Sequence, residues 1–453
     1  MRIKFLCAQG DLRVDFLTSD QNTLRALEKQ LRLTYENFKR KQLKLNMARG
    51  KPCPEQLDLS SGLLESLQGD YRAEDGTDCR NYGGIEGLPE ARRLFAELLE
   101  VRPDEIIVHG NSSLTLMHDL IARALLLGVE EGEPPWSRQP VKFLCPSPGY
   151  DRHFAICEFY NIQMLPVPLR EDGPDMDLVE RLVATDETIK GIWCVPKYSN
   201  PTGITYGDTV VERLAGMKTK ARDFRIFWDN AYAWHDLTSQ PDRLKNILTA
   251  CEEAGYPDRV YIFSSTSKIT YAGAGLAMVA SSVKNINRLK KQMAIQTIGP
   301  NKLNQLAHVR FFKNAQNLLV HMQKHAAIIR PKFELVQKIL QTELGAKKIA
   351  TWSRPKGGYF ISFNTLPGCA KEVVRLAAEA GVELTKAGAT FPYGHDPQDQ
   401  NIRIAPTYPP LDELKTAMEL FTVCVQLVSI EKILRERSHP PAGYRDRKEA
   451  QIV

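Results

Sequence analysis

The sequence predicts an α/β protein with a large domain, built on a mostly parallel sheet sandwiched by helices, and a smaller α+β domain. Its 453 residues exceed the size at which one hydrophobic core stops growing, and 43% hydrophobic with 25% charged residues is typical of a soluble globular protein. Continuous apolar runs alternate with helical stretches, which is the pattern of parallel strands covered on both faces. Seven such runs are expected to form strands: 106–108, 141–145, 162–167, 192–195, 224–228, 260–263 and 276–280.

Composition excludes several classes of protein. The formal net charge of +6 is a mild excess that suits small anionic ligands and does not require a nucleic acid. No run approaches the length of a membrane span, and the first residues lack a secretory signal. Nine scattered cysteines without a CxxC pair indicate reduced thiols. We therefore expect a cytoplasmic protein with neither nucleic acid nor membrane as a partner.

The chain divides into five expected segments. An aperiodic extension, an arm that opens with an amphipathic helix and joins the small domain, the large domain, the small domain and a charged mobile tail follow in that order. From about residue 303 to 344 the pattern is helical throughout. The expected segments are 1–20, 21–70, 71–329, 330–430 and 431–453.

Lys268 is the first candidate for chemistry, because it follows the apolar run 260–263 and stands among small hydroxyl residues. Burial lowers the pKa of a lysine, and a neutral amine attacks carbonyl groups, so Lys268 is a candidate to hold a carbonyl cofactor as a Schiff base. The alternative is a solvated loop lysine, which this stretch alone favours. The remaining strand ends decide between the two.

Polar residues follow the carboxyl ends of several predicted strands. In a parallel sheet ligands bind beyond these ends, so the residues are expected to converge on one cleft. Gly110 to Ser113, between a strand and a helix, suits an anion at the helix N-terminus as well as a plain N-cap. The convergent set is Asn111, Ser112, Ser113, Tyr150, Asn200, Asp229, Tyr232, Ser265, Ser267 and Lys268.

This set contains the parts that a pyridoxal 5′-phosphate site needs. Asp229 would keep the pyridine nitrogen protonated, and the pyridinium would be the cation that a buried carboxylate requires. Asn200 and Tyr232 could bond the ring oxygen, and Tyr150 could stack on the ring. Ser112, Ser113, Ser265 and Ser267 could hold the phosphate. Arg403, in a short apolar strand, is either a structural ion pair or a bidentate grip on a carboxylate.

His321 and His325, four residues apart on a probable helix, could suggest a metal site. No glutamate or third ligand accompanies them, so two histidines on one helix face is the expected reading and no metal is expected.

Four motifs in order give the chain a resemblance to the class I aminotransferases of fold type I. They are Asn200-Pro201-Thr202-Gly203, Asp229 with Tyr232, Ser265-Thr266-Ser267-Lys268, and Arg403. The match covers nearly all of residues 45 to 425. Three further motifs resemble a bacterial subgroup described as aspartate aminotransferases: Arg49-Gly50-Lys51-Pro52, Pro148-Gly149-Tyr150-Asp151 and Gly299-Pro300-Asn301-Lys302.

The resemblance implies a homodimer with active sites at the subunit interface. It implies that Tyr82 reaches the phosphate of the neighbouring subunit, and that Arg403 with the Gly50 backbone holds the substrate α-carboxylate. It also implies catalytic roles for Lys268, Asp229 and Tyr232. Lys268 forms the aldimine with the cofactor and is then the base of the 1,3-proton shift, while Asp229 keeps the ring electron-poor.

The chain departs from the family in two places. The loop after the lysine, 269–275, has no arginine for the phosphate, so hydroxyls, amides and a second cation are expected, with Lys302 as the candidate cation. Ahead of Gly299, Gln296 stands where dicarboxylate-specific members use an arginine of the partner subunit. Gln296 binds a carboxylate only as a neutral donor.

The expected function is transfer of the amino group of an L-amino acid, aspartate first, to a 2-oxo acid, 2-oxoglutarate first. Fold does not fix reaction, so a β-lyase or decarboxylase using the same cofactor is one alternative. A non-catalytic ligand sensor behind a helix-turn-helix head is another, although about forty-five residues before Arg49 are few for such a head.

Overall fold

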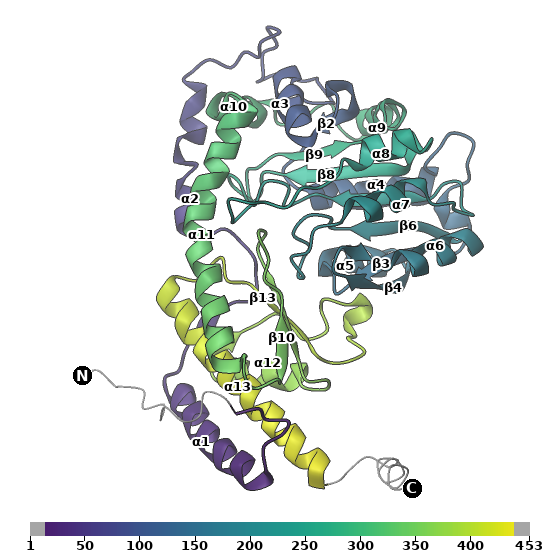
Figure 1. The fold of residues 1–453 in the computed structure, drawn as a ribbon. Coiled ribbons are helices and arrows are strands. Elements are labelled where there is room, and N and C mark those ends of the chain that lie inside the picture. Colours follow the sequence, from purple (N-terminus) through teal and green to yellow (C-terminus); the bar gives the residue numbers. More distant parts are fainter. Residues whose placement is uncertain (1–13, 439–453) are drawn as a thin grey trace.

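The computed structural model describes residues 14–438, which form a large mixed sheet covered by helices and a smaller body beneath it (Figure 1). The large sheet has eight strands in the order β2-β9-β8-β7-β6-β3-β4-β5. The five central strands from β8 to β4 are parallel to one another, whereas β9 and β5 pair antiparallel. The strands are β2 (Ile106–Val108), β3 (Lys142–Ser147), β4 (Gln163–Arg170), β5 (Gly173–Pro174), β6 (Ile189–Cys194), β7 (Arg225–Asp229), β8 (Val260–Ser265) and β9 (Ala277–Ala280).

The continuous apolar runs form central strands because each face of this sheet buries its own hydrophobic cluster. Consecutive residues of one strand belong to different clusters: Leu144 packs on one face and Phe143 on the other. The helices that cover the faces and edges are α3 (Pro89–Leu99), α4 (Ser113–Leu127), α5 (Asp151–Phe159), α6 (Met176–Thr185), α7 (Asp208–Gly216), α8 (Ile247–Glu253), α9 (Val283–Gln296) and α10 (Lys302–Phe312).

The smaller body holds two further sheets. Strands β10 (Ala350–Trp352), β11 (Ile361–Thr365) and β13 (Asn401–Ile404) form an antiparallel sheet, and β1 (Leu45–Asn46) pairs parallel to β12 (Val382–Glu383). Figure 1 shows α1 lying beside α13 at the bottom of the molecule. The helices are α1 (Gln21–Arg40), α2 (Pro54–Asp58), α12 (Ala370–Glu379) and α13 (Leu411–Ser438), and the 3₁₀ helices of the whole chain are η1 (Ser61–Leu67), η2 (Pro103–Glu105), η3 (Trp136–Arg138), η4 (Pro257–Arg259) and η5 (Pro392–Gly394).

Helix α11 (Ala315–Leu344) runs between the two bodies and contributes to both cores (Figure 1). Its first turns, up to Met322, pack in the core under the large sheet, and from Ala326 onward it packs in the core of the smaller body. This change of partner, close to residue 330, supports the domain division that we propose: an arm and small domain at 21–70 and 330–430, and a large domain at 71–329.

The structure differs from the sequence-based expectations in four details. The two-residue strand β5 adds an eighth strand at one edge of the sheet. Lys313 and Asn314 interrupt the long helical stretch, because Asn314 caps α11 by accepting from the Asn317 N–H. The expected tail begins too early, since α13 continues to Ser438 and buries Ile433. In the expected extension, Phe16 is buried, while residues 1–13, like 439–453, lie outside the described residues.

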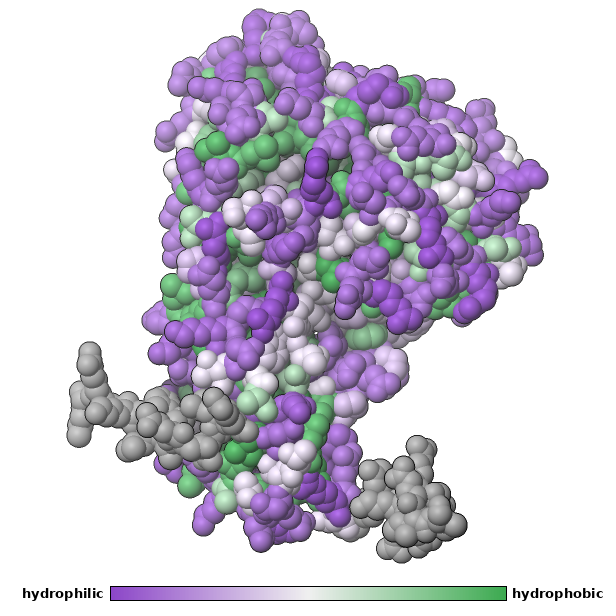
Figure 2. Space-filling view, in the orientation of Figure 1, coloured by the Kyte–Doolittle hydropathy of each residue, from purple (hydrophilic) through white to green (hydrophobic). Residues whose placement is uncertain are grey.

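The face of the molecule in Figure 2 is mostly hydrophilic, with small separated hydrophobic areas. Over residues 14–438, none of the helices combines the length and the apolar character needed to span a bilayer.

Candidate active site

The predicted polar residues converge on a cavity of about 190 Å³ at the carboxyl ends of the central strands. Strands β6, β7 and β8 are neighbours in the sheet, and the residues that follow them meet there, as the parallel arrangement requires. Asn111 lies just outside this lining and donates to the Gly273 carbonyl at 3.3 Å. The cavity is lined by Ser112, Ser113, Leu114, Met117, Tyr150, Val195, Asn200, Asp229, Ala231, Tyr232, Ser265, Ser267 and Lys268.

Lys268 lies in a turn directly after β8, where Ile269 and Thr270 both donate backbone bonds to the Thr266 carbonyl. Its Nζ lies 5.1 Å from the centroid of the Tyr232 ring and 5.8 Å from that of Tyr359. Desolvation lowers the pKa of Lys268, and the Asp229 charge opposes part of this shift. The geometry therefore favours a reactive amine over a solvated loop lysine.

Three buried histidines form hydrogen bonds with the two residues that follow Lys268. The sequence did not assign them to the site. His321 and His325 each place Nε2 2.9 Å from the carbonyl oxygen of Ile269, the residue after the lysine. His308 bonds Asn304 through Nδ1 at 2.8 Å and Thr270 through Nε2 at 2.9 Å. The i, i+4 spacing of the first two gave a signal, but only the fold shows that both face one carbonyl.

Asp229, the last residue of β7, is buried with its two oxygens in different situations. Oδ2 lies 2.9 Å from His153 Nε2, and His153 stacks on Trp193 with ring centroids 4.4 Å apart. Oδ1 is buried and has no hydrogen-bond partner among the described residues. Because an unpaired buried carboxylate oxygen is costly, this oxygen fits a protonated ring nitrogen in the cavity. His153 is a further residue that sequence reasoning did not assign to the site.

The hydroxyl groups around the cavity suit a phosphate. Ser112 is the N-cap of α4 and makes no side-chain capping bond, so its hydroxyl and the first amides of this 15-residue helix remain free for an anion. Ser265 donates to Ser267 Oγ at 3.1 Å. This supports the anion-binding alternative over the plain N-cap.

Tyr232 and Asn200 are placed to act as hydrogen-bond donors. Burial raises the pKa of the Tyr232 hydroxyl well above its usual value of 10.0, so it stays protonated. Asn200 is 2% exposed, and its Oδ1 accepts from Arg403 Nη1 at 3.3 Å, which leaves its NH₂ group for another acceptor.

Arg403 reaches the cavity region from β13 of the smaller body. Its Nη1 bonds Asp151 Oδ1 at 2.9 Å, and its guanidinium carbon lies 4.9 Å from the centroid of the Phe360 ring. A Cβ at Gly50 would collide with that same ring. The Phe360 ring therefore lies close against the Gly50 backbone and packs on Arg403 as well.

Three predicted residues lie elsewhere in this chain. Lys302, expected to be a phosphate cation, is buried and donates to the carbonyls of Asn81 and Gly83, both at 2.7 Å. Its ammonium holds the glycine-rich loop formed by residues 81–87. This role differs from the predicted one. The Gln296 amide bonds Arg123 and Asp119. Tyr82 is 79% exposed.

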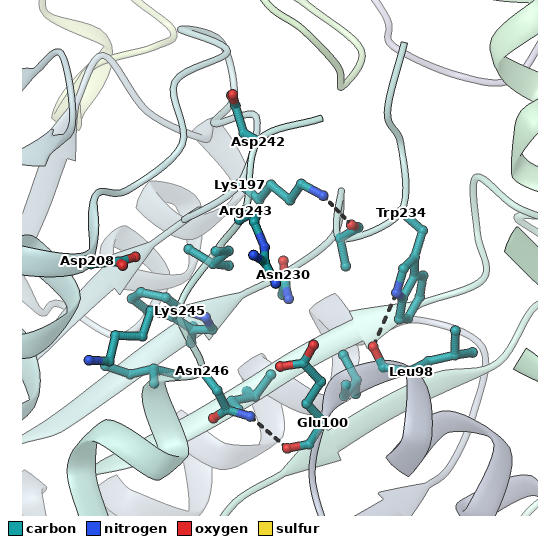
Figure 3. Close-up of a pocket in the computed structure, with 16 residues that line it drawn as sticks. Leu98, Glu100, Lys197, Asp208, Asn230, Trp234, Asp242, Arg243, Lys245 and Asn246 are labelled. Atoms are coloured by element: carbon teal, nitrogen blue, oxygen red, sulfur yellow. Dashed lines mark hydrogen bonds between the residues drawn. The ribbon is translucent and has the colours of Figure 1, made fainter. Parts of the chain in front are cut away.

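A second, larger cavity of about 570 Å³ is lined in part by Lys197 and Asn230, which follow β6 and β7 (Figure 3). Its cations and carboxylates are mixed, and its buried Lys197 already bonds the Ala233 carbonyl and Asp236. Its two lysines already pair with carboxylates, Lys197 with Asp236 and Lys245 with Glu212, so the smaller cavity suits the cofactor better. Over the described range, 14–438, the His, Cys, Asp and Glu side chains form no group of three able to hold a metal.

A nucleophilic lysine after a central strand, in one cavity with a carboxylate at the end of the neighbouring strand, defines a pyridoxal-phosphate-dependent enzyme of fold type I. The described residues fit the cofactor, since the free Asp229 oxygen, the hydroxyl cradle and the flanking rings each match one of its parts.

The chain belongs to the aspartate amino-transferase family, whose profile matches residues 18–437, and it is an aminotransferase. It is 44% identical to an aspartate aminotransferase of Corynebacterium glutamicum over 91% of this chain and 96% of that one. It is also 50% identical to a provisionally named aminotransferase of Mycolicibacterium smegmatis, over 94% of this chain and the whole of the other.

Solved structures share the fold of this chain. The crystal structure of an aspartate transaminase from C. glutamicum superposes with a TM-score of 0.90, at 44% identity, over 93% of this chain and all of that one. An α-aminoadipate aminotransferase of Thermus thermophilus, solved with N-(5′-phosphopyridoxyl)-L-leucine, shares the fold at a TM-score of 0.70 and 21% identity, over 86% of this chain and 93% of that one.

The buried His308 predicts an acid-sensitive stability. Burial lowers its pKa from 6.5 to about 4, so the unfolded chain takes up the proton first as pH falls. The stabilisation is complete above about pH 6.5 and is lost between there and pH 4; it amounts to about 3 kcal/mol in the free energy of unfolding. Urea unfolding at pH 7 and pH 4.5 should show a smaller loss for His308→Gln than for the wild type.

The exposed His395 offers a matched control for that experiment. His395→Gln should keep the wild-type pH dependence. An equal pH dependence for His308→Gln and the wild type would contradict the assignment of His308 as a neutral, hydrogen-bonded side chain.

Proposed function

We propose that this aminotransferase moves the amino group of L-aspartate to 2-oxoglutarate. The observation that carries the proposal is the pairing, in one cavity, of the desolvated Lys268 with an Asp229 oxygen that has no partner. The 44% identity to an aspartate aminotransferase supports the choice of substrate. When bound, the cofactor supplies an aldehyde for the amine and a pyridinium ring that withdraws electrons from the substrate Cα.

The positions of the residues support the following proposed roles. Lys268 binds the cofactor and afterwards moves the proton at the substrate Cα, a task for which a lowered amine pKa is suited. Tyr232 and Asn200 donate to the ring oxygen, and Tyr150 covers one face of the ring. Ser112, Ser113, Ser265, Ser267 and the neighbouring Asn111 hold the phosphate. Arg403 binds the α-carboxylate with its planar guanidinium, which Phe360 and Asn200 orient.

We also propose a cytoplasmic homodimer whose active sites are shared. Tyr82 on its loop, Ile295 in the last turn of α9 and Ile298 just after that helix are 79%, 91% and 61% exposed. A Cβ at Gly299 would collide with the Gly83 backbone, so the segment after α9 adjoins the loop of Tyr82. A second copy of the chain would cover this apolar surface. Lys302 fixes the loop from which Tyr82 would reach the partner's phosphate. Eight free, buried cysteines among the described residues support a reducing compartment.

The absorbance spectrum of the holoenzyme tests the reaction and the substrate together. Aspartate should convert the aldehyde form of the cofactor to the amine form, whereas leucine and phenylalanine should convert it much more slowly. Lys268→Ala should lose turnover and keep the fold, and borohydride should fix the cofactor on the peptide that contains Lys268 in the wild type only.

Other outcomes would select the alternatives. Pyruvate and ammonia formed without an oxo acid would indicate a lyase. Conversion by aromatic or aliphatic amino acids alone would remove aspartate as the substrate. Binding without any conversion would indicate a ligand sensor.

Asp229→Asn should lower turnover by about 10²–10³-fold, because a neutral amide cannot stabilise a protonated ring nitrogen as a carboxylate does. His153→Gln, which disturbs only the Oδ2 side, should cost less. Steady-state kinetics with aspartate measures both, and Asp175→Asn, far from the cavity, is the control. Near-normal turnover in Asp229→Asn would mean that another group protonates the ring.

Mixing inactive variants tests the shared site. In a mixture of Lys268→Ala and Tyr82→Ala protomers, a hybrid dimer regains one intact site if Tyr82 acts on its neighbour, so about a quarter of wild-type activity should return. Each variant alone should stay impaired. No recovery after subunit exchange, verified by native mass spectrometry, would place the action of Tyr82 within its own chain.

A further inference from the structure

The carboxylate of Asp151 is hydrogen-bonded to Arg403, the arginine proposed to bind the substrate carboxylate. Asp151 is the first residue of α5 in the large domain, and its Oδ1 bonds Arg403 Nη1 at 2.9 Å. Arg403 extends from β13 of the smaller body, so this ion pair crosses between the two bodies. The arginine side chain is 8% exposed and the aspartate side chain 34%, which leaves the aspartate open to solvent on one side.

The guanidinium has few free positions for a carboxylate. Nη1 already serves Asp151 and, at 3.3 Å, Asn200, while Nε points to Thr385 Oγ1 at 3.4 Å. In the described chain Nη2 has no partner of its own. A carboxylate gripped by two nitrogens must therefore share Nη1 or Nε with a group that is bound already, and Asp151 is the short, charged contact among these.

We propose that Asp151 is an internal competitor that lowers the affinity of Arg403 for the carboxylates of substrates and products. A bound carboxylate and Asp151 would lie on one guanidinium, so two negative charges repel each other there. The competition favours release of product acids, and it orients Arg403 between turnovers. This inference rests on the proposed role of Arg403 in carboxylate binding.

The alternative is a purely structural role for Asp151. An acidic residue in the first turn of a helix is favourable by itself, and α5 has no side-chain cap. That reading needs no arginine, however, and it predicts that loss of the charge changes stability and leaves carboxylate affinity as it is.

Asp151→Asn separates the two readings, because asparagine keeps an acceptor for Nη1 and removes only the charge. Isothermal titration calorimetry of the holoenzyme with maleate and with 3-phenylpropanoate should show about tenfold tighter binding in the variant. KM for the substrate acids should fall while kcat stays level or falls as product release slows. Asp151→Ser, which also shortens the side chain, should tighten binding less.

Asp175→Asn is the matched control, since Asp175 is the N-cap of a helix, α6, and pairs with an arginine, Arg170, at 2.6 Å. It should leave carboxylate affinity unchanged. Arg403→Lys should weaken binding of both probes in the wild type and in the Asp151→Asn background.

Each result of the calorimetry has a defined meaning. Unchanged or weaker binding in Asp151→Asn overturns the competitor role, and a shifted unfolding midpoint in the same variant then supports the role of Asp151 at the helix start. If only 3-phenylpropanoate binds the wild type, the proposed preference for a dicarboxylate substrate is wrong. The competitor role is then tested by comparing the affinity of the wild type and Asp151→Asn for 3-phenylpropanoate. If neither probe binds, Arg403 is not a carboxylate ligand and the inference falls with it.

Discussion

The unpaired oxygen of Asp229 is the constraint on which the site depends. A carboxylate buried at the end of a central strand is unfavourable unless its charge is paired and each of its oxygens has a hydrogen-bond donor. His153 satisfies one oxygen and is itself fixed by stacking on Trp193, so the carboxylate cannot turn away. The second oxygen faces the cavity that Lys268 also faces. The fold therefore holds this anion in readiness for a protonated heterocycle, and Lys268 supplies the covalent attachment beside it.

Much of the fold followed from the sequence because buried parallel strands leave a strong signal. The seven predicted strands all form, and the residues at their carboxyl ends meet in one cavity because parallel strands end at one edge. The edge strand β5 was not predicted, since two residues are too few to show a periodic pattern. The end of α13 was predicted too early for a different reason. The charged residues from Arg435 onward show no apolar pattern, although Ile433 just before them is buried.

Contacts between distant parts of the chain could not be predicted in the same way. Lys302 looked like a phosphate cation, but loop closure brings two carbonyls of the glycine-rich segment to its ammonium. His153, His308 and the pair on α11 look like ordinary helix-face residues until the fold turns them toward Asp229 and the turn of Lys268. Asp151 was quoted in a motif, yet its link to Arg403 spans 252 positions of sequence. Spacing within a segment does not report such contacts.

The charges of the site also bear on the assembly. The lining of the cofactor cavity includes one cation, Lys268, among the described residues, and this amine is committed to the cofactor's aldehyde. A phosphate held by serine hydroxyls and the amides of α4 therefore meets only neutral donors from its own chain. The exposed Tyr82, on the loop that Lys302 holds through two carbonyls, offers one more donor. The exposed apolar residues Ile295 and Ile298 of the adjoining segment would be buried by a second copy of the chain. Because residues 269–275 lack the family's arginine, the phosphate has no cation of this loop to bind it. Each hydrogen-bond donor from the neighbouring subunit would therefore contribute more to phosphate binding.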